Sequence, residues 1–419
     1  MILLKIALIF VLIVLLLRLK APFSISILFS GLVLGIGFSA GGGNQALVDI
    51  GRTALATLHE PETISLALIV GIILVLSELL QVSGQMTELG QVIIKTFGLH
   101  RWTYTILPAI IGLLPMPGGA LFTAPMMDGV SETSIPAHKK TLINYWFRHI
   151  WEYAWPLYPG LVLAAGLAKV NLNIFAIIQS PFTVISALIG AILILPGMSI
   201  SDQHIHKGSF KDFARMVYLI SPIIVIILLF IAFQLQMLIC VSAGLALAVF
   251  NILISRKLKI TAILRIIFAK VSVYQMIFVV ISVMAFTGIM RSSTLISELS
   301  RFFTGGIDGN IPFVYMTITI IFLPFIIGLL TGLTVGFVGI TFPLIFSTIV
   351  PNGIDVMPMA VLAYVSGVSG VMLSPVHLCL VLTNQYYNSS FRKVYKTLIP
   401  VALSVLALAV IGFLLYTLL

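Results

Sequence analysis

Residues Leu107–Met127 read LPAIIGLLPMPGGALFTAPMM, and residues Leu323–Ile345 repeat this stretch in altered form as LPFIIGLLTGLTVGFVGITFPLI. The two openings, LPAIIGLL and LPFIIGLL, agree at seven of eight positions, and the proline and the glycine are among the matches. Each copy then breaks into Gly, Pro and Thr before it turns apolar again. A pair of interrupted hydrophobic segments at corresponding places in two halves of a chain is typical of the binding site of a membrane transporter.

The composition of the chain indicates a membrane protein. Of its 419 residues, 60% are hydrophobic and only 9% are charged, which is more apolar surface than a soluble domain can bury. The net charge of +10 is better explained by Lys and Arg in cytoplasmic loops than by a nucleic-acid partner. The two cysteines, Cys240 and Cys379, form neither a metal-type spacing nor a disulfide framework, so we expect no cofactor and no bound metal.

Twelve apolar segments are long enough to cross, or nearly cross, a hydrocarbon core of about 30 Å. They fall into six and six, and further matches in the same order, such as GLVL at Gly31 and GLAL at Gly244, favour a duplicated unit. We therefore expect two repeats, residues 1–200 and 214–419, joined by a cytoplasmic linker at 201–213. The segments lie at about 2–17, 22–38, 64–82, 103–127, 143–167, 174–195, 214–232, 236–254, 271–290, 312–349, 357–383 and 396–419.

The distribution of positive charge predicts how the repeats sit in the bilayer. If the fourth segment of each half is a re-entrant hairpin, each half crosses five times and the second half is inverted. With the N-terminus outside, five of the 23 Lys and Arg lie outside, Arg148 lies within a helix and the other seventeen are inside, as the positive-inside rule requires. The five outside are Lys5, Arg52, Lys169, Arg291 and Arg301.

The predicted fold is thus an all-α polytopic membrane protein with both termini outside. It consists of two inverted repeats, each with five crossings, one re-entrant hairpin and a broken helix. We expect the hairpins at about 103–127 and 312–349, and the broken helices at about 143–167 and 357–383.

The hairpin tips cannot be continuous helix. The first reads Pro-Met-Pro-Gly-Gly and the second Thr-Gly-Leu-Thr-Val-Gly, and proline lacks the N–H that a helix needs. Carbonyls freed at such a tip can hold a cation, and helix N-termini can hold an anion. The alternative is a kinked helix that crosses fully and uses glycine for close packing. The tip residues expected to contact substrate or ion are Pro117, Gly118, Gly119, Thr331, Gly332, Thr334 and Gly336.

Each hairpin is followed by a helix that the sequence interrupts. Trp155–Gly160, WPLYPG, interrupts the first, and Ser374-Pro375 interrupts the second. Ser374 as N-cap and Pro375 as first helical residue would start a half-helix whose N-terminus can face an anion. His377 would then lie in the first turn of this half-helix.

Ionisable residues precede the first break, in the sequence NYWFRHIWEYAWPLYP. Arg148 and Glu152 are four residues apart and would share a helix face. Charged groups in a membrane helix are costly and usually face a cavity or a partner, so Arg148 or His149 would bind a carboxylate while Glu152 orients it or takes protons. The alternative is an internal ion pair, with Arg148 reaching the cytoplasmic interface. Glu78, late in the third segment, is either a proton site or interfacial.

The stretches PMPGGALFTAP and SPVHLCLVLT resemble the prokaryotic membrane proteins grouped as domain of unknown function 401, a gluconate-permease-like branch of the ion transporter superfamily. The resemblance covers nearly the whole chain. It implies a secondary carrier in the plasma (inner) membrane of a prokaryote, a homodimer, and an elevator-like motion of the hairpin elements. Dicarboxylate members of the superfamily carry Ser-Asn-Thr at both tips, and this chain does not.

The predicted function is ion-coupled secondary transport of a small organic anion, a gluconate- or dicarboxylate-like carboxylate, with Na⁺ or H⁺ as coupling ion. A cation/proton exchanger or channel that uses Glu78 and Glu152 is the alternative. An intramembrane enzyme built on Ser374 and His377 is remote, because no acidic residue lies nearby in sequence to orient the histidine. The predicted substrate-binding residues are Pro117, Gly118, Gly119, Thr123, Arg148, His149, Thr331, Thr334, Ser374, His377 and Asn384, and the predicted ion-coupling residues are Glu78, Glu152, Gly332 and Gly336.

Overall fold

The fold is described from a computed structural model, which covers residues 2–39, 44–97, 102–116, 119–128, 135–196, 209–255, 257–295, 297–298, 313–346 and 355–418. Within these ranges the chain is helical and contains no strand, and seven helical segments are long and apolar enough to cross a membrane. The predicted class, an all-α polytopic membrane protein, is therefore confirmed. The helices are α1 (Ile2–Arg18), α2 (Phe23–Gly37), α3 (Asn44–Leu58), α4 (Pro61–Val82), α5 (Gln85–Phe97), α6 (Thr103–Gly112), α7 (Ala120–Asp128), α8 (Ala137–His149), the 3₁₀ helix η1 (Ile150–Tyr153), α9 (Pro159–Ala168), α10 (Leu172–Ile194), α11 (Phe210–Ile231), α12 (Met237–Ile254), α13 (Ile260–Ala269), α14 (Val271–Ser292), α16 (Phe313–Thr331), α17 (Thr334–Leu344), α18 (Val356–Met372), α19 (Leu378–Tyr386) and α20 (Phe391–Leu418).

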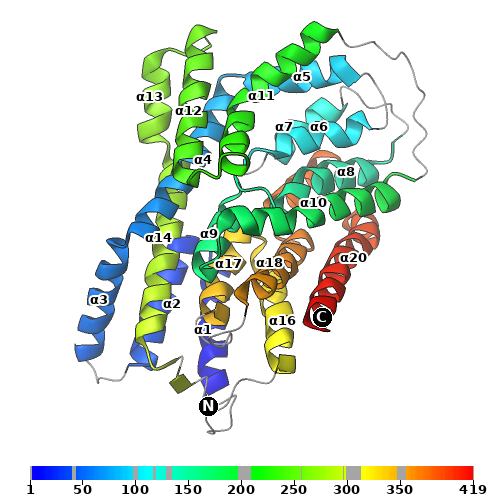
Figure 1. Ribbon diagram of the computed structural model, residues 1–419. Coiled ribbons are helices and arrows are strands. Elements are labelled where there is room, and N and C mark those ends of the chain that lie inside the picture. Colours follow the sequence, from blue (N-terminus) through cyan, green and yellow to red (C-terminus); the bar gives the residue numbers. More distant parts are fainter. Residues whose placement is uncertain are drawn as a thin grey trace.

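A bundle of long helices lies on one side of the molecule, and the interrupted helices lie beside it (Figure 1). Helix α14 lies beside α2, α3 and α4, and α12 packs against both α4 and α11. Polar contacts fasten one end of this bundle: Glu88 of α5 forms ion pairs with Arg215 of α11 and, at 2.5 Å, with Lys257 after α12. Lys95 of α5 pairs with Asp212 of α11 at 2.8 Å.

Both copies of the repeated stretch form a helix that ends before its Gly- and Pro-rich part. Helix α6 ends at Gly112, and α7 begins at Ala120 after Pro115 has removed one helical N–H. Helix α16 ends at Thr331, and α17 begins at Thr334. The intervening Gly332 has φ of +64°, a left-handed conformation that glycine adopts without steric cost.

The helices that follow are also interrupted. Helix α8 passes into η1, and α9 begins at Pro159, whose fixed φ suits a first helical position. Helix α18 ends at Met372, and α19 begins only at Leu378. The prediction that Ser374 caps a half-helix starting at Pro375 is wrong, because His377 holds the N-cap position. Ser374 Oγ instead accepts a hydrogen bond of 3.3 Å from the backbone N–H of Val376, a local turn that serine supports as readily as a helix start.

The interrupted helices pack in the same way in both halves. Helix α6 lies against α8, and α16 lies against α18, so the first arm of each stretch contacts the helix that follows it. The second arms cross over, since α7 contacts α19 and α17 contacts α9. Helices α10 and α20, which come last in each half, contact one another. The four helix breaks are thereby brought into one region of the molecule.

The glycine shared by the two sequence copies makes the same contact in each half. A Cβ atom added to Gly112 would overlap the carbonyl oxygen of Arg148 on α8. A Cβ atom added to Gly328 would overlap the carbonyl oxygen of Gly367 on α18. A clash with backbone cannot be relieved by a rotamer change, so the close approach of each pair of helices requires glycine.

Aromatic residues around the first break hydrogen-bond the carbonyls at the C-terminal end of α6. The last carbonyls of a helix have no donor within it, and they need partners when they are buried. Trp151 Nε1 donates to Ala109 O (2.7 Å), and Trp155 Nε1 donates to Leu113 O (2.9 Å). The hydroxyl of Tyr158 donates to the carbonyl of Gly112 (2.8 Å). The WEYAWPLY segment thus fixes α6 against the broken helix.

Candidate functional site

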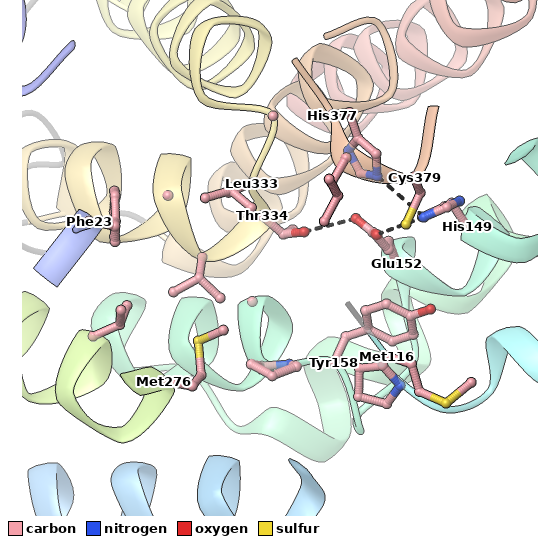
Figure 2. Close-up of a pocket in the computed structure, with 18 of the residues that line it drawn as sticks. Phe23, Met116, His149, Glu152, Tyr158, Met276, Leu333, Thr334, His377 and Cys379 are labelled. Carbon is pink, nitrogen blue, oxygen red and sulfur yellow. Dashed lines mark hydrogen bonds and ion pairs between the residues drawn. The ribbon is translucent and has the colours of Figure 1, made fainter. Parts of the chain in front are cut away.

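A cavity of about 310 Å³ lies where the four helix breaks meet. Figure 2 shows that polar side chains gather on one side of it, and that Phe23 and Met276 lie on the other. The polar side comes from the end of α8, η1, the second tip and the start of α19, and the apolar side comes largely from α2, α4 and α14. The predicted residues that line the cavity are Arg148, His149, Glu152, Gly332, Thr334, Gly336 and His377.

Arg148, in the last turn of α8, brings a permanent positive charge to this cavity. Its side chain is only 2% exposed, and no carboxylate of the described residues lies within ion-pair distance of it. Nη2 donates to the carbonyl of Met116 (3.2 Å), Nη1 lies 3.9 Å from Cys379 Sγ, and Nε makes no hydrogen bond. Gly119 lies directly against the guanidinium, where any side chain would overlap it. Because a guanidinium has five N–H donors, donors remain for a ligand.

Glu152 lies in η1, directly after the end of α8, and its side chain is buried. Its Oε2 accepts a hydrogen bond of 2.8 Å from Thr334, and its Oε1 lies 3.9 Å from His149 Nε2. The expectation that Arg148 and Glu152 share one α-helical face is wrong, because α8 ends at His149 and the chain tightens into a 3₁₀ turn. The two charged groups therefore have separate partners, and no ion pair joins them.

The rings of His149 and His377 are in contact. Their Nε2 atoms are 3.3 Å apart, and the rings meet edge to face with centroids 4.9 Å apart. The Nδ1 atom of His149 lies 2.6 Å from the carbonyl oxygen of Tyr145, which makes it the protonated nitrogen and leaves Nε2 as an acceptor. Both histidines are buried, and the ring of Tyr145 contacts both.

Two further predicted residues flank the cavity without lining it. The hydroxyl of Thr331 donates to the carbonyl of Ile327 in its own helix (2.7 Å). Ser374 is fully buried, and its Oγ lies against Gly332, where a Cβ atom would come within 2.9 Å of it. Neither hydroxyl faces the cavity.

Thr123 and Asn384 lie farther along α7 and α19. Thr123 donates to the side chain of Asn144, and Asn384 donates to the carbonyl of Ser389 (2.8 Å). The first bond joins α7 to α8, the second closes the turn after α19, and neither residue lines the cavity. The structure does not bring these two residues to the site.

Glu78 is also outside the site, because its carboxylate forms an ion pair with Lys270 at the junction of α13 and α14. This pair fits the interfacial alternative for Glu78 rather than a proton site in the cavity. Pro117 and Gly118 lie outside the described residues, so their part in the site stays a prediction.

Sequence reasoning missed residues that the fold brings to the site from other segments. Cys379 and Tyr158 line the cavity, and Met116 offers its carbonyl to Arg148. Asn144 links the two halves, since its Nδ2 donates to the hydroxyl of Thr383 (3.4 Å). The position of Cys379 two residues after His377, at the start of a half-helix, was the available signal.

Comparison with known proteins agrees with this fold. A family model described as "Protein of unknown function (DUF401)" matches residues 3–417. No protein of curated function matches the sequence. Among solved structures, the chain is similar to the YdaH transporter of Alcanivorax borkumensis, which has an unusual topology. The TM-score is 0.65 over 96% of this chain and 97% of that chain, with 13% sequence identity, so the likeness establishes the fold.

Proposed function

Since the chain belongs to the DUF401 family of proteins of unknown function, its activity has to be inferred from its own residues, and we propose that it is a secondary active transporter of a small organic anion. The observation that carries the proposal is the buried guanidinium of Arg148. This group lines the cavity, and its Nε–H makes no hydrogen bond to the described residues. A buried guanidinium without a carboxylate in direct contact is costly, and a bound carboxylate would supply that contact. The similarity to the fold of a transporter supports the same conclusion.

The lining of the cavity favours a particular kind of carboxylate. Arg148 is the one Lys or Arg among its lining residues, so the site offers one permanent positive charge. Opposite it lie Phe23, Leu74 and Met276, which would contact an apolar body but would not hydrogen-bond a polyol. We therefore favour a monocarboxylate with an apolar body over the gluconate- or dicarboxylate-like substrates that the superfamily resemblance suggests.

Charge balance supports the proton as the coupling ion. In the empty cavity an ionised Glu152 balances Arg148, and a bound monocarboxylate would add a second negative charge. One proton taken up by Glu152 restores neutrality, which matters because a net charge is costly to hold within the membrane. Na⁺ would need several oxygen ligands, whereas one Glu152 oxygen already accepts a bond from Thr334.

The proposed architecture, motion, oligomeric state and location rest on the packing repeated in both halves and on the resemblance to the ion transporter superfamily. The paired contacts of Gly112 and Gly328 support two inverted repeats, each with a re-entrant hairpin. Membership of the ion transporter superfamily, an elevator-type motion, a homodimer, a prokaryotic plasma membrane and external termini complete the proposal.

Two rival functions have less support. A cation/proton exchanger or channel would use Glu78, which is already paired with Lys270 outside the cavity. An intramembrane enzyme would need the His377 ring to activate Ser374, but the Nε2 of His377 faces His149.

Counterflow in proteoliposomes tests the proposal. Aliphatic and aromatic monocarboxylates, dicarboxylates and gluconate would be loaded inside, with a labelled substrate outside. We expect saturable monocarboxylate counterflow that Arg148→Gln reduces about tenfold or more, because a hydrogen bond to a charged group contributes about 1.5–3 kcal/mol. Arg148→Lys should retain part of the activity, and Arg215→Gln, which removes a cation outside the cavity, should retain most. Unchanged counterflow in Arg148→Gln, or exchange of cations alone, would overturn the proposal.

A further inference from the structure

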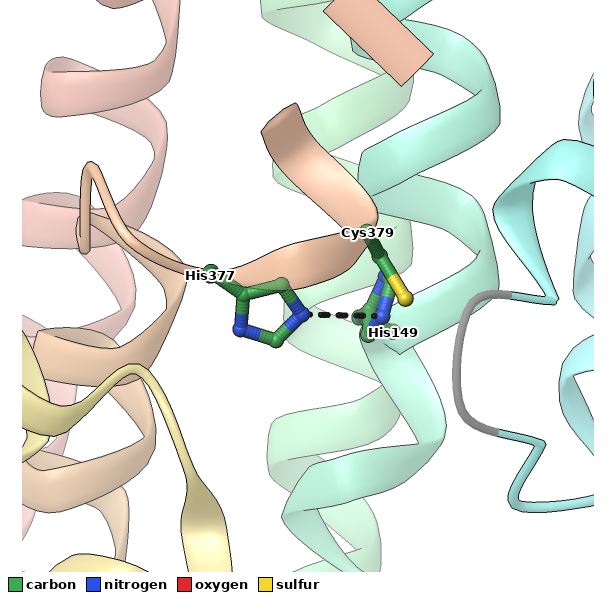
Figure 3. A group of neighbouring side chains, drawn as sticks. All are labelled: His149, His377 and Cys379. Carbon is green, nitrogen blue, oxygen red and sulfur yellow. Dashed lines mark hydrogen bonds between the residues drawn. The ribbon is translucent and has the colours of Figure 1, made fainter. Parts of the chain in front are cut away.

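Two imidazoles and a thiol converge at the polar end of the cavity (Figure 3). His149 comes from the end of α8, and His377 and Cys379 come from the start of α19. All three side chains are buried, and their ligating atoms lie within 4.8 Å of one another. These are the side chains that bind Zn²⁺ most often.

The spacing of the two histidines suits a metal ion. Their Nε2 atoms are 3.3 Å apart. Two nitrogens bound tetrahedrally to Zn²⁺ at about 2.0–2.1 Å would be about 3.3–3.4 Å apart. A tetrahedral sulfur ligand would lie about 3.6 Å from each nitrogen, roughly 1.2 Å less than the 4.8 Å within which the three ligating atoms lie, and a side-chain rotation of Cys379 covers such a shift.

The surroundings of the cluster orient its ligands. His149 Nδ1 is held by the carbonyl of Tyr145, which directs the Nε2 lone pair to the cluster, as outer partners of metal-bound histidines do. Glu152 Oε1 lies 3.9 Å from His149 Nε2. The second oxygen of the same carboxylate accepts the hydrogen bond from Thr334, so Glu152 lies beside the cluster rather than in it.

The nearby positive charge is compatible with a metal that binds thiolate. Arg148 Nη1 lies 3.9 Å from Cys379 Sγ, and a cation beside a thiol favours its ionised form. The thiolate would then offset the guanidinium charge. Thiolate and imidazole also select borderline and soft ions over hard ones.

We propose that His149, His377 and Cys379 bind a thiophilic transition-metal ion such as Zn²⁺ and leave its fourth coordination place open. The sequence spacing predicted no metal site, because the ligands come from two halves of the chain and form no local motif. Binding of the metal ion can be measured without a transport substrate, so the metal proposal can be tested independently of the transport proposal.

Titration of the purified, metal-free protein with Co²⁺ tests the site, with Zn²⁺ as competitor. We expect one Co²⁺ per chain, tetrahedral visible absorption and a thiolate-to-cobalt charge-transfer band, all displaced by Zn²⁺. Cys379→Ser should remove the charge-transfer band. His377→Gln should weaken binding by at least about a hundredfold, because loss of an outer partner alone costs about 10–100-fold.

The chain offers matched controls for both changes. Cys240→Ser alters its other cysteine, and His138→Gln alters a histidine at the opposite end of α8, so both should bind Co²⁺ as the unaltered chain does. Gel filtration and melting temperature would show that each variant is folded. The proposal would be overturned if the unaltered chain binds no Co²⁺, or if the band survives in Cys379→Ser. Anion counterflow that persists in a chain that binds no metal would leave the transport proposal intact.

Discussion

Thr334 donates a hydrogen bond of 2.8 Å to Glu152, although 182 positions separate the two residues. The bond joins the first residue of α17 to the 3₁₀ turn after α8, and so joins the second tip to the first broken helix. In the proposed mechanism this carboxylate takes and releases the coupling proton. The bond therefore holds the proton site in one place relative to Arg148.

Loss of this hydroxyl should impair transport. We expect Thr334→Val to lower proton-driven uptake about tenfold or more, because it removes a bond to a charged group, and Thr334→Ser to retain most of it. Initial rates in proteoliposomes with an imposed pH gradient measure the effect. Thr331→Val is the matched control, since that hydroxyl donates to Ile327 O in its own helix and accepts a local bond from the backbone N–H of Leu333, with no bond to Glu152. Equal rates for Thr334→Val and the unaltered chain would remove Thr334 from the mechanism.

A methyl group at Gly160 should act through the same bond. A Cβ atom there would lie 2.8 Å from both Cβ and Cγ2 of Thr334, so Gly160→Ala must displace Thr334 from Glu152. We expect slower uptake in Gly160→Ala and a partial recovery in the double variant Gly160→Ala/Thr334→Ser, which lacks Cγ2. Independent effects of the two changes in a double-mutant cycle would contradict this coupling.

The two glycines of the repeated stretch should be equally intolerant of substitution. Gly112→Ala and Gly328→Ala each force a methyl group onto a backbone carbonyl, and we expect each to lower stability by about 1–3 kcal/mol, the usual cost of overpacking. Thermal unfolding in detergent measures the loss. Gly412→Ala in α20 is the control, because a Cβ atom there meets no heavy atom within 4 Å. A similar melting temperature for all three variants would show that the helices separate at little cost.

The ion pairs of Glu88 predict a pH dependence of stability outside the candidate spans. Partial burial opposes ionisation of this carboxyl, but hydrogen bonds from Lys257 and Arg215 outweigh it and lower the pKa of Glu88 below its ordinary value. A carboxyl whose pKa is lower in the folded state stabilises the fold above the unfolded pKa of about 4.3 and loses this effect as the pH falls through the folded value.

Melting temperatures of the unaltered chain and of Glu88→Gln test this expectation. Their difference should be constant near neutral pH and should shrink as the pH falls below about 4. Glu62→Gln, at an exposed position in the first turn of α4, provides the control. A difference that grows toward low pH would show that Glu88 is not stabilised by its cationic partners.

The sequence predicted the membrane class of the fold and the most polar part of the cavity because both leave local signals. Hydrophobic runs reveal membrane helices, and a charged residue such as Arg148 within such a run is conspicuous. The tip at Gly332 could likewise be predicted, because this glycine interrupts an apolar run. These features depend on neighbouring residues alone.

The remaining parts depend on contacts between the halves. Nothing near Cys379 in the sequence shows that its thiol lies beside Arg148, and nothing near His377 shows that it faces His149. The start of α19 was misplaced because serine before proline stabilises a turn as well as a helix cap. Glu78 looked like a membrane carboxylate because its partner Lys270 is 192 positions away.

The crossed packing of the second arms has a consequence for biosynthesis. The glycine contact of α6 with α8 needs only the first half of the chain, so this pair can form as soon as that half has been inserted. Glu152 and His149, however, find their partners Thr334 and His377 only in the second half. Until α17 and α19 have been synthesised and inserted, the first half holds ionisable groups without their final partners. The site is therefore completed only late in synthesis, and a nascent chain that stalls before α17 would be a natural target for membrane quality control.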